Sequence, residues 1–363
     1  MNSRNVFRAL AGAIRFNGTK LNRSQWYSSR KCHSNSKNES GQTNSGQLSY
    51  VQRMKMLQNL REKTGMTEEV IRNGKCLLYF KGDPLLTDDF EIAWMDFADL
   101  CVEPKLFLEN ALLLGMTDAG QFQFAVQIAG FGPELKQAVI NKSQGNFTDF
   151  RLSLMMMSTS ESALASKAKA IFNWHRRNTH CAKCGSPSAR NSTASCRTCH
   201  KCEEVWYPSL SPVGIVLVAD SLKTKLLLVR QGRHPKGMYS CIAGYVDSGE
   251  TLEEGIRREV AEEVGLTVLS VDYKASQHWS FPTSNLMIGC HAIVSGNEAL
   301  DVDTSELEDA RWFTVEEVRR SLNAIKSNPL ETMSSVKEGT NNFFVPPRGT
   351  LAHALIDSWL INN

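Results

Sequence analysis

Two short apolar runs, separated by a turn, open the C-terminal part of the chain. Residues 213–219 and 225–230 are rich in branched aliphatic side chains, and Asp220 and Ser221 stand between them. Branched aliphatic residues favour strands, and the polar pair favours a turn. The pattern predicts two consecutive β-strands.

The residues from 50 to 178 have a globular pattern but carry no catalytic motif. Residues 76–80 form an apolar run that ends in a Gly-Asp-Pro turn, and residues 124–128 form another. Both runs predict strands. Apolar side chains recur at helical spacing between residues 160 and 177, which predicts a helix that leads into the next segment.

A loop followed by an amphipathic helix is predicted for residues 244–266. Thr251 is a candidate N-cap, and Glu254 follows it at the spacing of a capping box. Apolar residues then recur at every fourth position, so that one face of the helix can be buried. Gly265 stands where a helix often ends in the left-handed conformation.

Three carboxylates lie on this predicted helix. Glu259 and Glu263 are four residues apart, and Glu262 is three residues from Glu259, so that all three share one flank. Like charges at this spacing cost roughly 0.2–0.5 kcal/mol per pair, and Arg258 can relieve one of them but not all. Hard oxygen ligands of this kind suit Mg²⁺ or Mn²⁺, which bridge to substrate phosphates. The cluster favours hydrolysis of a phosphoanhydride over a merely solvated acidic face.

Paired cysteines predict a structural zinc site. Two C-x-x-C turns, separated by fourteen residues, are formed by Cys181, Cys184, Cys199 and Cys202. Two such turns can close a tetrahedral shell of thiolates at about 2.3 Å and leave no position for a catalytic water. Cys196 stands at the same spacing from Cys199, and His180 and His200 are alternative ligands. We favour the pair 199/202, with Cys196 outside the site and the zinc as a scaffold.

Composition narrows the class of protein. The chain has 363 residues, of which 42% are hydrophobic and 22% charged, enough for two or three domains. Its apolar runs are far shorter than the roughly 20 residues of a membrane span, so we expect no membrane segment. The other five cysteines are scattered singly, which is typical of reduced thiols, and we expect no disulfides.

Charge is distributed unevenly along the chain. The formal net charge is +3, but residues 1–38 hold eight Lys and Arg and no Asp or Glu. Without those eight, 33 basic residues face 38 acidic ones, a net charge of −5. A mildly acidic remainder argues against nonspecific binding to a polyanion.

The first 38 residues predict a mitochondrial transit peptide. Phe7, Leu10 and Ile14 form one helical stripe among arginines, and no acidic residue interrupts them. The alternative is a disordered basic tail without a targeting role. Residues 39–49 are polar and nearly devoid of large apolar side chains, which is typical of a linker.

The loop and helix also carry a known signature. Their sequence fits the Nudix box, G-x5-E-x7-R-E-U-x-E-E-x-G-U, at every defined position. The matching residues are Gly244, Glu250, Arg258, Glu259, Glu262, Glu263, Gly265 and Leu266. The chain therefore resembles the Nudix hydrolases, and this resemblance implies an α/β fold with an α/β/α sandwich around a mixed sheet.

Residues outside the box narrow the resemblance to the NADH pyrophosphatase subfamily. That subfamily has S-Q-P-W-P-F-P-x-S after the box, and residues 276–284 read Ser-Gln-His-Trp-Ser-Phe-Pro-Thr-Ser, with His278 and Ser280 in place of two prolines. The four-cysteine ribbon followed by Trp206-Tyr207-Pro208 is a further subfamily feature. The resemblance covers about residues 50–363, and a mitochondrial animal member fits best.

The resemblance implies an organisation for the whole chain. After the transit peptide (1–38) and the linker (39–49), we expect an α+β N-terminal domain of the NADH pyrophosphatase type over 50–178. A zinc ribbon over 179–207 and the Nudix hydrolase domain over 208–363 follow. Members of the subfamily are often homodimers, and the same assembly is implied here.

Roles for individual residues follow from the same resemblance. Glu259 and Glu263 are implied as metal ligands with Glu262 assisting, Glu263 as the base for the attacking water, and Glu306 as the acid that completes the metal site. Tyr245 and Trp279 are implied as aromatic contacts of the nicotinamide. Residues 344–352 match a C-terminal loop against the base. The dinucleotide-contacting set is Tyr245, Trp279, Gln277, Phe281 and Ala352.

The sequence thus predicts a Mg²⁺- or Mn²⁺-dependent enzyme that cleaves the pyrophosphate of NAD(P)H-type dinucleotides to nicotinamide mononucleotide and AMP or 2′,5′-ADP. Removal of a nicotinamide cap from RNA breaks the same bond and is the second hypothesis. It requires a positive groove, which the acidic balance disfavours. The third is a non-catalytic protein that uses the zinc ribbon to bind nucleic acid or to act as a scaffold.

Overall fold

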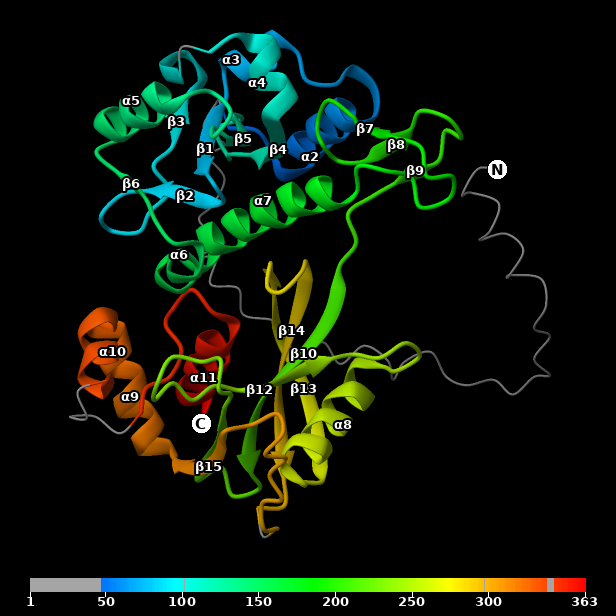
Figure 1. Ribbon diagram of the computed structural model, residues 1–363. Helices are drawn as coiled ribbons and strands as arrows, with labels where there is room; N and C mark the ends of the chain where they lie inside the picture. Colours follow the sequence, from blue (N-terminus) through cyan, green and yellow to red (C-terminus); the bar gives the residue numbers. More distant parts are fainter. Residues whose placement is uncertain (1–46, 101, 297, 338–342) are drawn as a thin grey trace, which may run out of the picture. The chain divides into compact units, whose positions relative to one another are not determined.

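The computed structural model describes residues 47–100, 102–296, 298–337 and 343–363. The expected transit peptide (1–38) lies outside the described residues, as does all but the end of the expected linker (39–49). The described residues pack as one compact unit, to which all elements below belong (Figure 1). No helix in the described part of the chain combines the length and the apolar character that a membrane crossing requires.

The N-terminal half is built on a six-stranded sheet of order β4-β5-β1-β2-β6, with β3 also paired to β1. Strand β1 runs parallel to β5 and antiparallel to β2 and β3. Its strands are β1 (Lys75–Phe80), β2 (Asp83–Leu86), β3 (Met95–Asp96), β4 (Ala111–Met116), β5 (Phe122–Gln127) and β6 (Asn146–Phe147). The strands predicted at 76–80 and 124–128 correspond to β1 and β5.

Helices cover both faces of this sheet. On one face, buried side chains of α2 to α5 pack against Leu78 and Phe124. On the other face, α6 and α7 pack against Leu77 and Tyr79. The helical segments are α2 (Tyr50–Asn59), η3 (Leu60–Thr64), α3 (Glu68–Arg72), η4 (Phe97–Leu100), α4 (Pro104–Asn110), α5 (Pro133–Ser143), α6 (Phe150–Met156) and α7 (Thr159–Arg177). The helix predicted between residues 160 and 177 is therefore present as α7.

A small antiparallel sheet follows α7. It consists of β7 (Ser188–Arg190), β8 (Arg197–Cys199) and β9 (Val205–Trp206), in that order. A short sheet of this kind buries little apolar surface. Arg197 is nevertheless buried, and it joins β8 to β7 through hydrogen bonds from its Nε and Nη2 to Ser188.

The C-terminal half contains a second six-stranded sheet, of order β13-β14-β10-β11-β15 with β12 also paired to β10. Strands β10 and β14 are parallel, and the other pairs are antiparallel. Its strands are β10 (Ser211–Asp220), β11 (Lys225–Arg230), β12 (Ile242–Tyr245), β13 (Val268–Trp279), β14 (Asn285–Val294) and β15 (Asp309–Thr314). The two strands predicted at 213–219 and 225–230 are thus found in β10 and β11.

This second sheet lies between two helical layers. Helix α8 (Leu252–Val264) covers one face, where Ile256 and Val260 pack against Val216 and Val218. Helices α9 (Val315–Ser327) and α11 (Leu351–Asn362) cover the other, and α10 (Pro329–Lys337) packs against α9. Because β10 is covered on both faces, its sequence is almost continuously apolar. The expected α/β/α sandwich around a mixed sheet is confirmed.

Local sequence signals fix both ends of α8. Thr251 Oγ1 accepts a hydrogen bond from the backbone N–H of Glu254 (3.2 Å), and Glu254 Oε2 accepts one from the N–H of Thr251 (2.7 Å). Gly265 caps the other end with φ +71° and ψ +21°. The predicted capping box and left-handed terminus are confirmed, and they hold the acidic flank of α8 in a fixed register.

The tip of the β13–β14 pair contacts the N-terminal half. The ring of Phe281 packs at a tilt against that of Phe150 in α6, with ring centroids 5.4 Å apart. The hydroxyl of Ser166 in α7 lies 2.9 Å from Nδ1 of His278, and Ser162 donates a hydrogen bond to the carbonyl of Gly349. The two sheets are therefore joined by side-chain contacts as well as by the chain itself.

Candidate active site and cysteine cluster

Gly244 at the end of β12 allows Glu259 to approach the sheet. A Cβ atom built on Gly244 would overlap the carboxylate atoms of Glu259. Because real Cβ contacts are never this short, any other residue at 244 must displace that carboxylate. The first glycine of the box is thus required by the packing of one of its acids.

Glu263 is the most deeply buried acid of the box. Its side chain is 2% exposed, and its Oε2 atom is buried without a hydrogen-bond partner. The pKa of Glu263 is raised to about 8, chiefly by burial and also by the negative charges of Glu259 and Glu306, while the charge of Arg233 opposes the rise. An orphaned, desolvated carboxylate oxygen next to other acids is costly unless a cation or proton satisfies it.

Arg258 bridges several acids of the site. Its guanidinium donates hydrogen bonds to Glu250 Oε1 (2.7 Å), Glu250 Oε2 (3.0 Å), Glu259 Oε1 (2.9 Å) and Glu262 Oε2 (2.9 Å). It also donates to the carbonyl of Tyr245 (2.8 Å). Arg258 relieves two of the three acids and not the single one expected, because its N–H groups reach Glu259 and Glu262 together. As expected, it does not relieve all of them, since no ion pair joins it to Glu263. Glu250, eight residues earlier, completes the network, and its pKa falls to about 2 chiefly through the hydrogen bonds from Arg258.

The three acids of the predicted cluster therefore occupy different surroundings. Glu262 is exposed and ion-paired with Arg258. Glu259 is partly buried and ion-paired with the same arginine, and burial raises its pKa while Arg258 opposes the rise. Glu263 makes no ion pair with a described residue. The three do not meet within 4.8 Å, since the cysteine cluster is the one group of potential ligands in the described chain that does so.

Glu306 reaches this region from a separate loop. The loop is held against the end of α8 by backbone hydrogen bonds from Asp303 to Glu263 (3.0 Å) and from Asp301 to Val264 (3.1 Å). Glu306 is exposed, yet it raises the pKa of both Glu259 and Glu263. The fold thus brings Glu306 into electrostatic reach of the box acids from over forty residues away in sequence.

Arg233 is a residue of this region that sequence reasoning missed. It lies on the loop after β11, is exposed, and lowers the pKa of Glu263 through its charge. No motif marks it, and its electrostatic effect on Glu263 is seen only in the folded structure. In the sequence, Arg258 and Glu250 could be recognised only as two defined positions of the Nudix box. Only the folded structure shows that they form an ion pair.

The predicted aromatic contacts are divided between two places. Tyr245 follows Gly244 in β12 and is 44% exposed. Trp279 and Phe281 lie at the end of β13, with ring centroids 6.3 Å apart, and they pack against the core formed with α6 and α7. Arg151 lies over the ring of Phe281 at 4.9 Å.

Gln277 joins β13 to the C-terminal loop. Its Nε2 donates a hydrogen bond to the carbonyl of Gly349 (2.8 Å), while its Oε1 is buried without a partner. Ala352 is buried two residues beyond the N-cap of α11, Thr350. The structure therefore joins Gln277 to the loop that precedes α11, the helix in which Ala352 lies.

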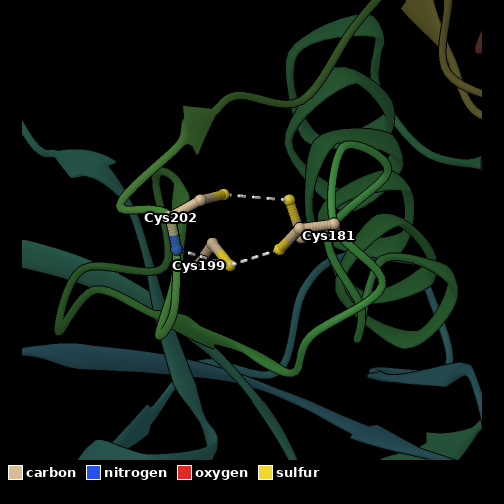
Figure 2. Close-up of side chains that lie close together, drawn as sticks. Cys181, Cys199 and Cys202 are labelled. Atoms are coloured by element: carbon tan, nitrogen blue, oxygen red, sulfur yellow. Dashed lines mark hydrogen bonds between the residues drawn. The ribbon is translucent and has the colours of Figure 1, made fainter.

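The four cysteines converge on one point. Figure 2 shows Cys181 facing Cys199 and Cys202 across a small gap. The Sγ atoms are 3.7 Å apart for Cys181 and Cys202 and 3.4 Å apart for Cys184 and Cys199, and all four lie within 4.8 Å of one another. Thiolates bound tetrahedrally at about 2.3 Å are spaced by roughly 3.8 Å. The donor set and spacing therefore fit a closed tetrahedral metal site.

The flanking candidates stay outside this group. Cys196 is half-buried, and its backbone N–H donates to Asn191. His180 and His200 do not belong to the group either. Hydrogen bonds from Ser186 lower the pKa of Cys184, which favours the thiolate form that binds metal.

Comparison with known proteins agrees with this geometry. A model of the NUDIX domain matches residues 209–333, and the chain belongs to the Nudix hydrolase family. The human mitochondrial NAD(P)H pyrophosphatase NUDT13 is 38% identical over 260 residues, which cover 70% of this chain and 72% of that protein. The mouse form is 33% identical over 327 residues, 86% of this chain and 91% of that protein.

Other Nudix proteins are similar to this chain over a smaller part of its length. The human NAD-capped RNA hydrolase NUDT12 is 38% identical over 215 residues, 57% of this chain and 43% of that protein. Among solved structures, a NUDIX hydrolase from Nitrosomonas europaea is 21% identical, with a TM-score of 0.30, and covers 46% of this chain and 97% of its own.

Proposed function

We propose that this protein hydrolyses the pyrophosphate bond of NAD(P)H-type dinucleotides, giving nicotinamide mononucleotide and AMP or 2′,5′-ADP. The observation that carries the proposal is the buried, unpartnered Oε2 of Glu263 beside Glu259 and Glu306. Two relatives that cover most of this chain are named NAD(P)H pyrophosphatases, which supports the same substrate class here.

The acids fit a divalent cation. Glu259, Glu263 and Glu306 offer hard oxygen donors from α8 and a neighbouring loop, and these donors suit Mg²⁺ or Mn²⁺. When bound, such an ion neutralises diphosphate oxygens and acidifies a coordinated water. We assign Glu259 and Glu263 as its ligands, with Glu262 assisting and Glu306 completing the set.

The residues of the acidic site have different parts in this proposal. Glu263 takes the proton of the attacking water, because its free Oε2 is not used by any bond within the described protein. Arg258 pairs with Glu259 and Glu262 and holds the loop through Glu250. Gly244 leaves room for Glu259.

The dinucleotide contacts are proposed on the basis of position. Tyr245 presents a partly exposed ring directly after Gly244, and stacking of a flat ring on it is worth roughly 1–3 kcal/mol. Gln277 and Trp279 lie at the end of β13, Phe281 follows it, and Ala352 lies in the first turn of α11; we propose them as the further dinucleotide contacts. We further propose that the four cysteines hold a structural Zn²⁺ and that the enzyme is mitochondrial, as residues 1–38 and the names of its relatives suggest.

Product analysis tests the proposal. The purified full-length protein is incubated with NADH and either Mg²⁺ or Mn²⁺, and the nucleotides are separated and quantified. We expect equimolar reduced nicotinamide mononucleotide and AMP. NADH that stays intact with both ions would contradict the proposal. Parallel reactions with NADPH, NAD⁺ and ADP-ribose rank the substrates.

The alternatives make different predictions in the same experiment. Since relatives at 38% identity are named NAD-capped RNA hydrolases, NAD-capped RNA is included as a substrate, and faster turnover of the capped RNA would favour that activity. A non-catalytic zinc-ribbon protein predicts no product at all. It predicts instead a nucleic-acid mobility shift that survives Glu263→Gln and is lost with a chelator.

A further inference from the structure

Helix α2, far from the acidic helix in sequence, carries apolar side chains on more than its buried side. Leu57 is buried against the N-terminal sheet, and so is Leu60 directly after the helix. Tyr50, Val51 and Met54, in contrast, are 68%, 59% and 36% exposed. A group of apolar side chains that is exposed together and bordered by charged residues is typical of a surface that contacts another protein or a membrane.

The three exposed residues lie on one side of α2, and we call this surface the α2 face. Successive residues of an α-helix are about 100° apart around its axis, so Met54 falls about 40° from Tyr50 and Val51 about 100° from it. Met56 falls on the opposite side of the helix, where it lines a groove together with Val70 of α3. The α2 face is therefore separate from that groove.

Basic residues accompany the α2 face. Residues 50–64 contain Arg53, Lys55, Arg61 and Lys63 and a single acid, Glu62. Lys55, Arg61 and Lys63 are exposed and make no ion pair with a described residue. This local excess of positive charge contrasts with the net charge of −5 over residues 39–363. The segment is thus complementary to a partner that is both anionic and apolar.

The α2 face is held in a fixed shape. Ser49 and Gln52 form a capping box, in which Ser49 Oγ accepts a hydrogen bond from the N–H of Gln52 (3.2 Å) and Gln52 Oε1 accepts one from the N–H of Ser49 (2.8 Å). Arg53 forms an ion pair with Asp118 in the turn between β4 and β5, and its guanidinium lies 5.9 Å from the centre of the Tyr50 ring. Because the helix is already ordered, little entropy is lost when it binds a partner.

A lipid surface fits this combination of side chains. Tyrosine rings favour the headgroup level of a bilayer, and aliphatic side chains favour the boundary between headgroups and acyl chains. Lysine and arginine side chains reach from such a depth to the lipid phosphates. A helix that lies in the interface needs no membrane-spanning length. The side chains of the α2 face and its flanking cations thus match the layers of an anionic bilayer surface.

We propose that the α2 face binds the surface of an anionic phospholipid bilayer. Val51 and Met54 enter the boundary between headgroups and acyl chains, and Tyr50 lies at the level of the headgroups. Lys55 and Arg61 contact lipid phosphates. The protein is then a peripheral membrane protein, whichever dinucleotide its acidic site hydrolyses.

Co-sedimentation with vesicles tests the proposal. The full-length protein is mixed with vesicles of phosphatidylcholine alone, or of equal parts phosphatidylcholine and phosphatidylglycerol, at low and at high salt. We expect binding to the mixed vesicles at low salt to be at least about tenfold stronger than to phosphatidylcholine, and to weaken at high salt because salt screens the charges. No binding to the mixed vesicles, or equal binding to both kinds, overturns the proposal.

Variants with unchanged net charge locate the contact. They are needed because residues 1–38 hold eight basic residues, which attract anionic lipids independently of α2. The double substitution Val51→Gln and Met54→Gln should weaken binding to the mixed vesicles at least about tenfold. Met56→Gln is the matched control, since Met56 is 40% exposed on the opposite side of the helix, and it should leave binding unchanged. Wild-type binding by the double variant refutes the proposal.

A charge reversal tests the cations separately. Lys55→Glu should weaken binding to the mixed vesicles about tenfold. Lys225→Glu changes the net charge equally at an exposed position at the start of β11, and it should weaken binding less than about twofold. Equal losses from the two substitutions would attribute the binding to net charge alone and contradict the role of α2.

The oligomeric state without lipid distinguishes a membrane from a second copy of this chain. Analytical ultracentrifugation should give the same mass per particle for the wild-type protein and for the variant with Val51→Gln and Met54→Gln, and both should unfold at the same temperature. A smaller particle for the variant would show that a second copy covers the α2 face, and it would overturn the proposal.

Discussion

The cysteine cluster and the acidic helix α8 are two ligand sets built in opposite ways. The four thiols come from two turns and already lie within 4.8 Å of one another. The box acids come from one helix, and Arg258 holds Glu259 and Glu262 while Glu263 stays buried with a free oxygen. We infer that the first set is closed around a resident ion, and that the second is open to an ion that arrives with the substrate.

The largest difference between the two regions should appear in catalysis. Glu263→Gln should lower kcat by about 10³- to 10⁴-fold, or roughly 4–5.5 kcal/mol, because the substitution removes the proposed base. Thermal unfolding should occur at the same temperature or higher, since a neutral amide is easier to bury than a carboxylate whose pKa is raised to about 8. Steady-state kinetics and calorimetry measure both quantities, and a variant with wild-type kcat would remove Glu263 from the mechanism.

The cysteine cluster should affect stability more than chemistry. Cys199→Ser should lower the free energy of unfolding by about 4 kcal/mol, because it opens the metal shell of a small sheet. Cys196→Ser is the matched control, and it should change stability by less than about 1 kcal/mol because Cys196 lies outside the group. Chemical denaturation and zinc analysis report the outcome. Equal losses of unfolding free energy from the two substitutions would contradict the assignment of Cys199, and not Cys196, to the cluster.

Gly244 tests how closely the acidic region is packed. Gly244→Ala should lower kcat by about 10- to 100-fold, or about 1.4–2.7 kcal/mol, since a Cβ there would displace the Glu259 carboxylate. Stability should change little, because the displaced group is the end of a side chain. Gly130→Ala serves as control, as a Cβ at that position meets no atom within 4 Å. Full activity of the 244 variant would show that Glu259 is free to move.

The smallest effect concerns the junction of α7 with the ribbon. His175 Nε2 lies 2.9 Å from the carbonyl of Ala194, and its Nδ1 lies 3.2 Å from Arg197 Nη1. Since a carbonyl accepts and a guanidinium donates, His175 is neutral with the proton on Nε2. The pKa of His175 is lowered to about 4, chiefly by burial; the hydrogen bond with the Ala194 carbonyl opposes the shift, and the charges of Arg190 and Arg197 add to it.

This depressed pKa gives a pH dependence of defined sign. His175 favours the fold above its unfolded pKa of about 6.5, and this contribution is lost as pH falls from there toward 4. Replacing it with Gln should reduce the acid-induced loss of stability between pH 7 and pH 4.5 by about 1–2 kcal/mol. Denaturation curves at both pH values measure it, and an unchanged pH dependence would show that His175 titrates normally.

Elements that depend on residues close together in sequence could be predicted. The limits of α8 follow from Thr251, Glu254 and Gly265, and the long strands follow from their aliphatic runs. The two-residue strands β3 and β6 leave no such pattern, so the order of the N-terminal sheet could not be predicted. A pattern of two residues is too short to separate a strand from a turn.

The sequence could name candidate residues for the site, but it could not give their arrangement. The spacing of the acids identified Glu259, Glu262 and Glu263, yet the burial of Glu263 and the reach of Arg258 to Glu250 depend on how β12 meets α8. Arg233 and the Ser166–His278 contact join residues that are distant in sequence, and only the sheet topology brings them together.

Binding of Mn²⁺ tests the central claim most directly. Electron paramagnetic resonance follows free Mn²⁺ as it is titrated with the full-length protein, in the presence of a non-hydrolysable dinucleotide analogue. We predict that the wild-type protein binds Mn²⁺ and that Glu263→Gln weakens this binding at least about tenfold. Identical Mn²⁺ affinities for the wild-type and variant proteins would contradict the claim that the acids of α8 hold a metal ion against a diphosphate.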